Sequence, residues 1–253
     1  MPIEELHFEH APIVEALITI EVQPLTDASM LALEATARAV QPDYPTSEPL
    51  NQFEIQVGLN IQAGFIPQQT IAHDPRFGFK LVSSDKRQLA VFRRNGFGFS
   101  RLPPYETWGT FRDEARRLWN LFRAAAGEVT FTGFGLRYIN RLYIPVAERI
   151  DNFLRLYPEV PNNPDGSTPT IHGLYMRLDS NLEEPTGHLI IQEAMLPTER
   201  HDSATISLDF DLRYPTPAAC TEDFVWETLE GARQKKNHLF VNSLTPTFLE
   251  TFR

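Results

Sequence analysis

Cysteine is almost absent from this sequence, since its 253 residues include only Cys220. One cysteine can form no disulfide within the chain and no zinc site of cysteine ligands, so we expect a reducing compartment. Long apolar runs are also missing, because no stretch approaches the ~18–20 apolar residues that cross a bilayer. The first ten residues, MPIEELHFEH, are acidic where a signal peptide is basic. The sequence therefore predicts a soluble cytoplasmic protein without a membrane partner.

Positive charge is scarce overall, because the net charge is −10. This balance disfavours non-specific binding to nucleic acid or to an anionic membrane. The basic residues are nevertheless concentrated, since residues 93–141 contain nine arginines and four acidic residues, a local balance of +5. Such a run is typical of a solvated or ion-paired surface, and it also suits an anion-binding face, because the planar guanidinium matches phosphate and carboxylate groups.

Catalytic and phosphate-binding motifs are missing as well. The sequence contains no Gly-x-Ser-x-Gly elbow, no His-Glu-x-x-His pair and no Walker lysine in a glycine-rich loop. His201-Asp202-Ser203 has the residue types of a triad, but adjacency in sequence does not give triad geometry. Asp209 and Asp211 share a strand face that could hold a hard metal, although the same face resembles an ordinary solvated one. We assign no catalytic residue, cofactor or metal, and expect a protein that is not an enzyme.

Alternating apolar and polar residues are clearest in 53–61, 15–22 and 205–212. Because buried parallel strands form continuous apolar runs, this alternation favours an antiparallel sheet. Asn95-Gly96 predicts a two-residue hairpin turn. Weaker strand patterns lie near 77–83, 88–94, 97–101, 129–144, 170–179 and 186–195.

Helical periodicity predicts a long amphipathic helix over 105–126, with Gly127 at its C-terminal stop. A second long helix is predicted over 221–240, with Thr221 as its N-cap and an apolar stripe through Phe224, Thr228, Ala232, Lys235 and Leu239. Shorter helices are expected at 27–40 and 147–156, and the proline-rich stretch 158–169 is expected to be a loop.

This element order predicts an α+β fold, an antiparallel sheet with long amphipathic helices packed on one face. A strand–helix–strands–helix plan occurs twice, in residues 1–127 and 128–253, which we expect to form one continuous structural unit. The layout resembles the tandem repeats of TATA-binding-protein-like and helix-grip folds. That resemblance concerns the fold and carries no function by itself.

The strongest site candidate is the segment 135–144. As a strand it would place Arg137, Arg141 and Tyr143 on one face, where they could clamp a phosphate or carboxylate group. The alternative is that the arginines pair with acidic residues on neighbouring strands. The remaining candidates for this anion-binding face are Arg93, Arg94 and Asn140.

Several segments together resemble a sporadically distributed family of bacterial proteins of about 250 residues, defined by sequence and without an assigned function. The segments are APIVEALI (11–18), Tyr105-x-x-Trp108-x-x-Phe111, LRYINR (136–141) and KNHLF (236–240) followed by Ser243-Leu-Thr245. The resemblance covers essentially the whole chain. It implies a bacterial cytosolic protein and implies no activity, cofactor or substrate. One of its motifs includes Arg137, Tyr138, Asn140 and Arg141.

The leading hypothesis is a non-enzymatic binding or interaction protein whose arginine-lined face holds an anionic small molecule or protein partner. The first alternative is a nucleic-acid-binding protein in which the aromatic residues Phe77, Phe79, Phe92, Phe97 and Phe99 stack on bases. The second is a metal-dependent hydrolase that uses Asp209 and Asp211. A homodimer is compatible with the need to cover edge strands, but the sequence does not decide it.

Overall fold

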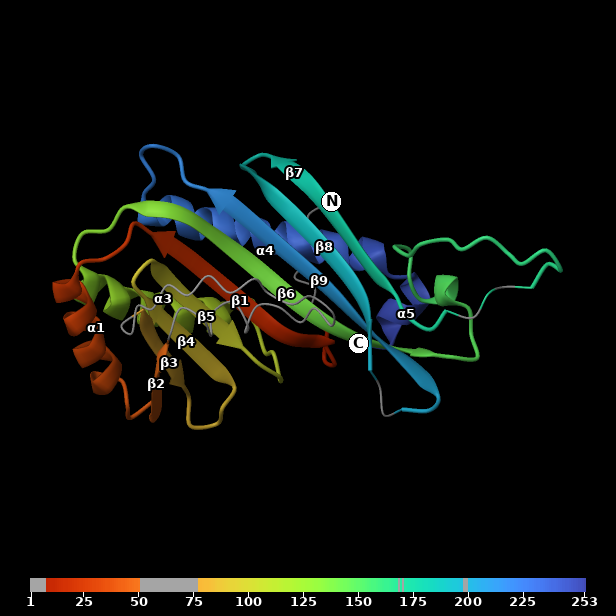
Figure 1. Ribbon diagram of the computed structural model, residues 1–253, viewed down its shortest axis with the longest axis horizontal. Coiled ribbons are helices and arrows are strands. Elements are labelled where there is room, and N and C mark those ends of the chain that lie inside the picture. Colours follow the sequence, from red (N-terminus) through yellow and green to blue (C-terminus); the bar gives the residue numbers. More distant parts are fainter. Residues whose placement is uncertain (1–7, 51–76, 168, 170, 198–199) are drawn as a thin grey trace. The chain divides into compact units, whose positions relative to one another are not determined.

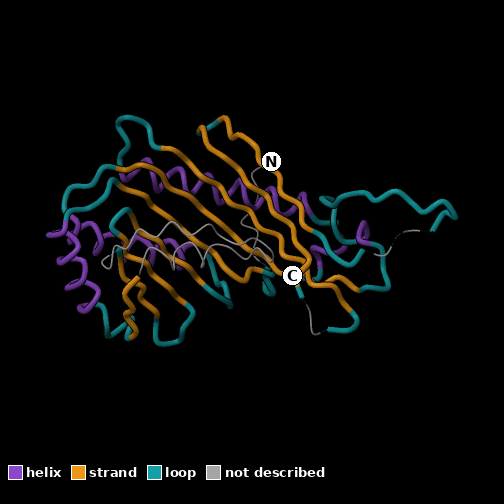
Figure 2. The backbone as a smooth tube through the Cα atoms, in the orientation of Figure 1, coloured by secondary structure: helices purple, strands orange, loops and turns teal. Residues whose placement is uncertain are grey.

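A computed structural model of the chain describes residues 8–50, 77–167, 169, 171–197 and 200–253. Within them the chain is an α+β protein with an antiparallel sheet, as the sequence predicted, and the sheet has nine strands beside four α-helices (Figures 1 and 2). The strand order is β2-β3-β4-β5-β1-β6-β9-β8-β7. In the described part of the chain, no helix is long and apolar enough to cross a membrane.

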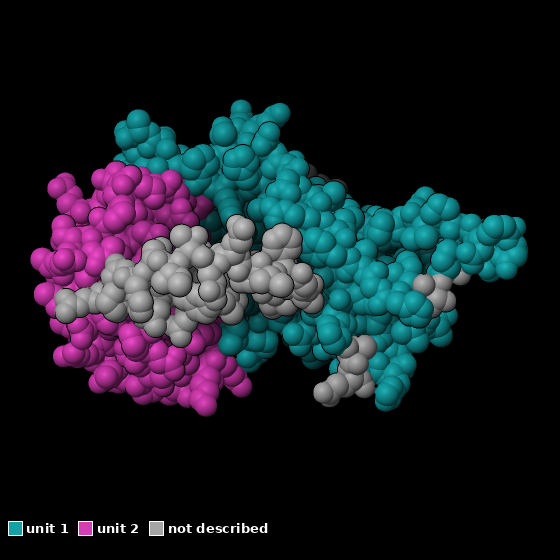
Figure 3. All heavy atoms as spheres, viewed as in Figure 1, with its two compact units in different colours: residues 1–16, 102–107, 135–253 teal, residues 17–101, 108–134 magenta. Residues whose placement is uncertain are grey.

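The chain divides into two compact units (Figure 3). Unit 1 comprises residues 1–16, 102–107 and 135–253, and unit 2 comprises residues 17–101 and 108–134. Both units are therefore discontinuous in sequence. The repeat predicted over 1–127 and 128–253 was a repeat of element order. The division into two units does not test it, and it stays a prediction.

Most predicted strands are confirmed within the described residues, although the clearest one, 53–61, lies outside them. The strand predicted at 170–179 begins later, at Tyr175. The sequence patterns missed β2 (Thr46–Leu50), whose Pro49 interrupts its alternation. The other strands are β1 (Ile13–Val22), β3 (Gly78–Val82), β4 (Gln88–Arg93), β5 (Gly96–Arg101), β6 (Phe131–Pro145), β7 (Tyr175–Glu183), β8 (Thr186–Leu196) and β9 (Ser203–Pro215).

The three longer helices are confirmed as α1 (Asp27–Ala39), α3 (Trp108–Ala126) and α4 (Glu222–Ser243), and a short α5 (Pro246–Glu250) follows. Thr221 caps α4 as predicted, because its side chain accepts a hydrogen bond from the amide of Phe224. The helix predicted over 147–156 is wrong, since only a 3-10 turn, η1 (Ile150–Asn152), forms there. The chain leaves the helical path because Leu154 makes an antiparallel bridge with Leu244.

Unit 2 has a core of aromatic rings from its strands and from α3. The rings of Phe92 and Phe97 on β4 and β5 lie 5.8 and 6.2 Å from that of Phe122, and Trp119 stacks on Phe122 at 5.3 Å. All four side chains are fully buried. The predicted Asn95-Gly96 hairpin joins β4 and β5. Gly96 is required there, because its φ is +152° and an added Cβ would lie 2.4 Å from the Ile20 carbonyl oxygen.

Unit 1 builds its core from the inner face of β9 and from α4. Ile206, Leu208, Phe210 and Leu212 alternate along β9 and are all buried, as the sequence pattern predicted. The helix face differs from the predicted one. Thr228 and Ala232 are buried as expected, but the stripe runs through the neighbouring residues Val225, Leu229, Lys236 and Phe240. Lys236, and not Lys235, therefore lies inside unit 1.

Candidate functional site

The candidate site lies on β6, whose residues alternate between two environments. Leu136, Tyr138 and Leu142 are buried, whereas Arg141 and Tyr143 are exposed and Arg137 is partly exposed. The predicted arginine face therefore exists, and Arg137, Arg141 and Tyr143 share it. Asn140 belongs to the opposite, interior face, where its Nδ2 donates to the carbonyl oxygen of Leu208 at 3.0 Å.

Arg137 is engaged by a carboxylate of its own unit. Its Nε donates to Asp209 Oδ1 at 3.0 Å and its Nη2 donates to Oδ2 at 2.5 Å. Asp209 is 6% exposed and Arg137 is 17% exposed, so the pair is largely desolvated. Burial opposes the charged guanidinium, but the hydrogen bonds and charge of Asp209 outweigh it and raise the pKa of Arg137. The structure therefore shows the alternative interpretation for Arg137, an ion pair with an acidic residue on another strand.

Arg141 lies four residues along the strand from Arg137. At ~3.3 Å per residue the two Cα atoms are about 13 Å apart, and Asp209 holds the side chain of Arg137, so the two arginines do not form a clamp for one small anion. Arg141 is exposed, and its side chain has no hydrogen bond or ion pair within the part of the chain that the structure describes. Its main-chain amide is held by the carbonyl oxygen of Pro12 at 2.8 Å. The backbone is therefore fixed while the guanidinium faces solvent.

Tyr143 extends the same face, and Arg200 joins it. Tyr143 is 38% exposed. The guanidinium carbon of Arg200 lies 3.7 Å from the centre of the Tyr143 ring, a close cation–π contact. Arg200 was not among the residues predicted from sequence, because it precedes β9 and no motif surrounds it. We call Arg141, Tyr143 and Arg200 the β6 cationic surface.

The two remaining predicted arginines belong to unit 2. Arg94 fixes the chain before α1, since its Nη1 donates to the Leu25 carbonyl and its Nη2 to Asp27 Oδ1, both at 2.9 Å. Burial lowers the pKa of Arg93, and the nearby charge of Glu21 opposes that shift. The Nε of Arg93 is buried without a hydrogen-bond partner among the described residues. Arg94 thus acts in local structure, and Arg93 is partly withdrawn from solvent.

Asp209 and Asp211 do not present two open carboxylates. Asp209 binds Arg137, and Asp211 Oδ2 accepts from Arg213 Nη2 at 2.6 Å. Both aspartates are buried. Within the described residues no group of three or more histidine, cysteine, aspartate or glutamate side chains could hold a metal.

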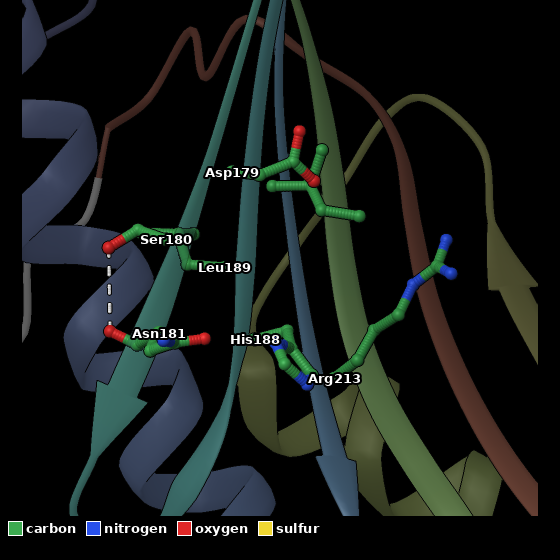
Figure 4. Close-up of a pocket in the computed structure, with 7 residues that line it drawn as sticks. Asp179, Ser180, Asn181, His188, Leu189 and Arg213 are labelled. Carbon is green, nitrogen blue, oxygen red and sulfur yellow. Dashed lines mark hydrogen bonds between the residues drawn. The ribbon is translucent and has the colours of Figure 1, made fainter.

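A shallow hollow of about 270 Å³ lies over β7, β8 and β9 of unit 1 (Figure 4). Asn181, His188 and Arg213 are paired across the three strands and line it, together with Asp179. The figure shows His188 and Arg213 projecting from neighbouring strands. Asp179 and Arg213 both line the hollow, so it combines both signs of charge and does not add to the β6 cationic surface.

A buried polar cluster inside unit 1 was also missed by sequence reasoning. The hydroxyl groups of Tyr105 and Tyr138 are hydrogen-bonded at 2.8 Å, and Lys236 Nζ lies 3.8 Å from the centre of the Tyr138 ring. Burial lowers the pKa of Lys236 to about 7, with a further contribution from the charge of Arg233. The sequence signal for this cluster was present but misread, because the predicted helix face was one residue out of register.

Glu193 on β8 is the second buried ionisable group in that interior. It is 1% exposed, and neither carboxylate oxygen has a hydrogen-bond partner among the described residues. Burial raises the pKa of Glu193 to about 7. Neither it nor Lys236 contributes to the exposed face of β6.

Of the five aromatic residues proposed to stack on bases, Phe77 and Phe79 are partly exposed and the other three are not accessible. Phe92, Phe97 and Phe99 are all fully buried, and Phe99 stacks on Phe111 of α3 at 5.5 Å. These three rings stabilise unit 2 and cannot form a base-stacking platform.

Comparisons with known proteins provide no family assignment. A scan of the chain against models of protein families matches none of them, and a search of curated proteins finds no match. The candidate site is therefore interpreted from its own geometry, and the resemblance to a sporadically distributed bacterial family stays a prediction.

Proposed function

We propose that this chain is a non-enzymatic binding protein that holds an anionic group at the β6 cationic surface. The observation that carries the proposal is the contrast between two arginines of one strand face. Arg137 is bound by Asp209 through two of its guanidinium nitrogens, whereas Arg141 is exposed and has no side-chain partner in the described residues. An arginine on a fixed strand with an open guanidinium is suited to bidentate recognition of phosphate or carboxylate.

The neighbours of Arg141 support the same chemistry. Tyr143 is two residues further along the strand, about 7 Å away at the strand rise, and its hydroxyl can donate to an anion. The guanidinium carbon of Arg200 lies 3.7 Å from the centre of the Tyr143 ring, which places a second positive charge beside Tyr143. Arg141 and Tyr143 thus offer donors to an anion, and Arg200 adds a positive charge beside them.

The proposed ligand is a small molecule or protein surface that carries a phosphate or carboxylate group. Nucleic acid is a weaker candidate, because the net charge is −10 and three of the five aromatic rings expected to stack on bases are buried. A hydrolytic reaction at Asp209 and Asp211 is disfavoured by the arginines that engage both carboxylates.

A thermal-unfolding screen tests the proposal with inorganic phosphate, a nucleoside triphosphate, an acidic peptide and a DNA oligonucleotide. A ligand at 100 times its dissociation constant stabilises the native state by ~2.7 kcal/mol, which is measurable as a higher Tm. We expect a shift with at least one of the first three probes. Arg141→Ala should abolish that shift, and Tyr143→Ala should reduce it.

Arg87→Ala is the matched control, because Arg87 is an exposed arginine of unit 2. It removes the same charge and should leave the shift unchanged. A shift that persists in Arg141→Ala, or that Arg87→Ala removes equally, would contradict the assignment. A salt-sensitive shift with the oligonucleotide alone would favour the nucleic-acid alternative.

We also make two proposals about the fold. We propose that the helices pack on one sheet face and that two tandem strand–helix–strands–helix repeats build the chain. Contacts of α1 and α3 with each other and with β3 and β5 support this packing within unit 2. A cytoplasmic location is proposed from the single cysteine of the sequence.

A further inference from the structure

The outer edge of β7 pairs with no further strand among the residues that the structure describes. In the strand order β7 is the terminal strand, with β8 as its neighbour. Seven of its nine residues are exposed. The edge therefore presents a row of backbone amide and carbonyl groups to solvent, which is the template for pairing with another strand.

The opposite terminal strand differs from β7. Strand β2 has five residues and contains Pro49. Short length and proline are two devices that protect an edge strand from pairing. The nine residues of β7, YMRLDSNLE, contain neither proline nor lysine. Of the two edges, β7 is the one suited to accept a strand.

The hydrogen bonds between β7 and β8 determine which residues of β7 can pair with an added strand. The amide of Met195 donates to the carbonyl oxygen of Leu174, and Tyr175 pairs with Ala194 in the adjoining register. Hydrogen bonding to β8 alternates along an antiparallel pair, so even-numbered residues bond β8 and odd-numbered residues point their backbone groups outward. The outward set includes Arg177, Asp179 and Asn181.

A second copy of the same strand complements this edge in one register in particular. If a twofold axis passes through Leu178, outward residues meet outward residues, and Arg177 lies opposite Asp179 of the second copy in both directions. An axis through Asp179 would instead place that carboxylate opposite itself, which is unfavourable. In the single chain Arg177 Nε already donates to Asp179 Oδ2 at 2.8 Å, so the dimer would join two such pairs into one alternating cluster.

Apolar contact favours the same axis. Leu178 is 42% exposed, a large fraction for an apolar side chain. On the axis it lies opposite its own copy in a non-hydrogen-bonded pair, where Cα atoms are ~4.5 Å apart and side chains are in contact. We propose that the chain forms a homodimer by antiparallel pairing of β7 with β7 of a second copy, with the axis at Leu178.

A charge-swap series tests this register by sedimentation of the full chain. Arg177→Asp or Asp179→Arg alone places like charges opposite each other and should weaken dimerisation by at least about tenfold. The double variant Arg177→Asp/Asp179→Arg restores opposite charges and should recover the wild-type dimer. Leu31→Asp, at an exposed leucine of α1 in unit 2, is the control and should leave the dimer unchanged.

Cross-linking provides a second, geometric test in a Cys220→Ser background. Leu178→Cys places two thiols in a non-hydrogen-bonded pair within the Cα range of a disulfide, so mild oxidation should give a covalent dimer. Ser180→Cys is the matched control, because Ser180 is exposed on the same strand but lies opposite Met176 of the second copy. It should cross-link much less.

Three results would overturn the proposal. The first is a chain that stays monomeric at all concentrations without a cross-link at position 178. The second is a dimer that the charge variants leave intact. The third is efficient cross-linking through position 180 and not through 178, which would place the axis elsewhere on the strand.

Discussion

The interiors of the two units differ in the side chains they bury. Unit 2 is filled with aromatic rings, and its buried hydroxyl groups within the described residues are those of Tyr44, Ser83 and Ser100. The buried carboxylate and amine side chains of the described residues all belong to unit 1: Glu193, Asp209, Asp211 and Lys236. One unit is therefore stabilised by packing, while the other also contains charges removed from water.

This difference indicates where pH and ligands can act. Phenylalanine and tryptophan side chains do not titrate. The loss in free energy of unfolding when one of these rings is removed should therefore be the same at every pH. A buried ionisable group couples stability to pH, because its pKa differs between the folded and unfolded states. The unit with the buried charges also carries the exposed Arg141, so the ion-paired Arg137 and the arginine of the proposed binding surface belong to the same unit.

The largest effect is expected from Phe122→Ala in unit 2. Phe122 is fully buried and contacts Phe92, Phe97 and Trp119. Removing the ring should lower the free energy of unfolding by roughly 3–5 kcal/mol, from lost burial and from the cavity left behind. Denaturant unfolding at pH 5 and pH 8 should give the same loss. A loss that depends strongly on pH would contradict the claim that packing, and not charge, stabilises unit 2.

The next largest loss in the free energy of unfolding is expected from Arg137→Ala in unit 1. It leaves Asp209 buried without its bidentate partner, and breaking such a pair costs roughly 3 kcal/mol or more. The loss should shrink at low pH, where Asp209 is protonated. The double variant Arg137→Leu/Asp209→Leu supplies the control, since it removes both charges and should recover much of the stability. Equal destabilisation by the single and double variants would show that side-chain shape, and not charge, holds this site.

Glu193→Gln should stabilise the chain by roughly 2 kcal/mol at pH 8. The folded-state pKa of Glu193 is raised from 4.5 to about 7, so the folded state binds the proton more tightly than the unfolded state does. The wild-type contribution to stability therefore falls as pH rises from about 4.5 to 7 and stays low above it. Unfolding of both proteins from pH 4 to pH 8 should show the gain only in the upper range. A gain that is already complete at pH 4 would exclude ionisation as its cause.

The smallest effect on stability is expected from Arg141→Ala. Its side chain is exposed and has no partner in the described residues, so the free energy of unfolding should change by within about 0.5 kcal/mol. Thermal unfolding without ligand checks this value. A large loss would show that Arg141 supports the fold in the way that Arg137 does, and the contrast between them would fail.

Sequence patterns predicted the elements of this fold better than their contacts. The alternation in β9 predicted both a strand and its buried residues, because one face of a sheet strand repeats every second residue. The buried face of α4 was predicted one residue out of register, since Lys235 and Lys236 are adjacent and either could complete a stripe. The strand β2 was missed because proline interrupts its alternation.

The candidate site was predicted only in part for the same physical reason. The shared face of Arg137, Arg141 and Tyr143 follows from strand geometry alone. The partners do not, because Asp209 is 72 residues from Arg137 in sequence and reaches it only through strand pairing. Arg200 comes to the Tyr143 ring in the same long-range way. Strand periodicity thus predicts the sheet face on which a side chain lies. Pairing across the sheet determines whether that side chain forms an ion pair.

The most direct test of the binding proposal is a calorimetric titration of the anion that gives the largest thermal shift. It should compare the wild type with Arg141→Ala and Arg87→Ala at one fixed salt concentration. We expect Arg141→Ala to raise Kd by at least about tenfold, the loss of a charge-assisted bidentate contact, while Arg87→Ala keeps the wild-type Kd. An unchanged Kd in Arg141→Ala would contradict the assignment of the anion site to the β6 cationic surface.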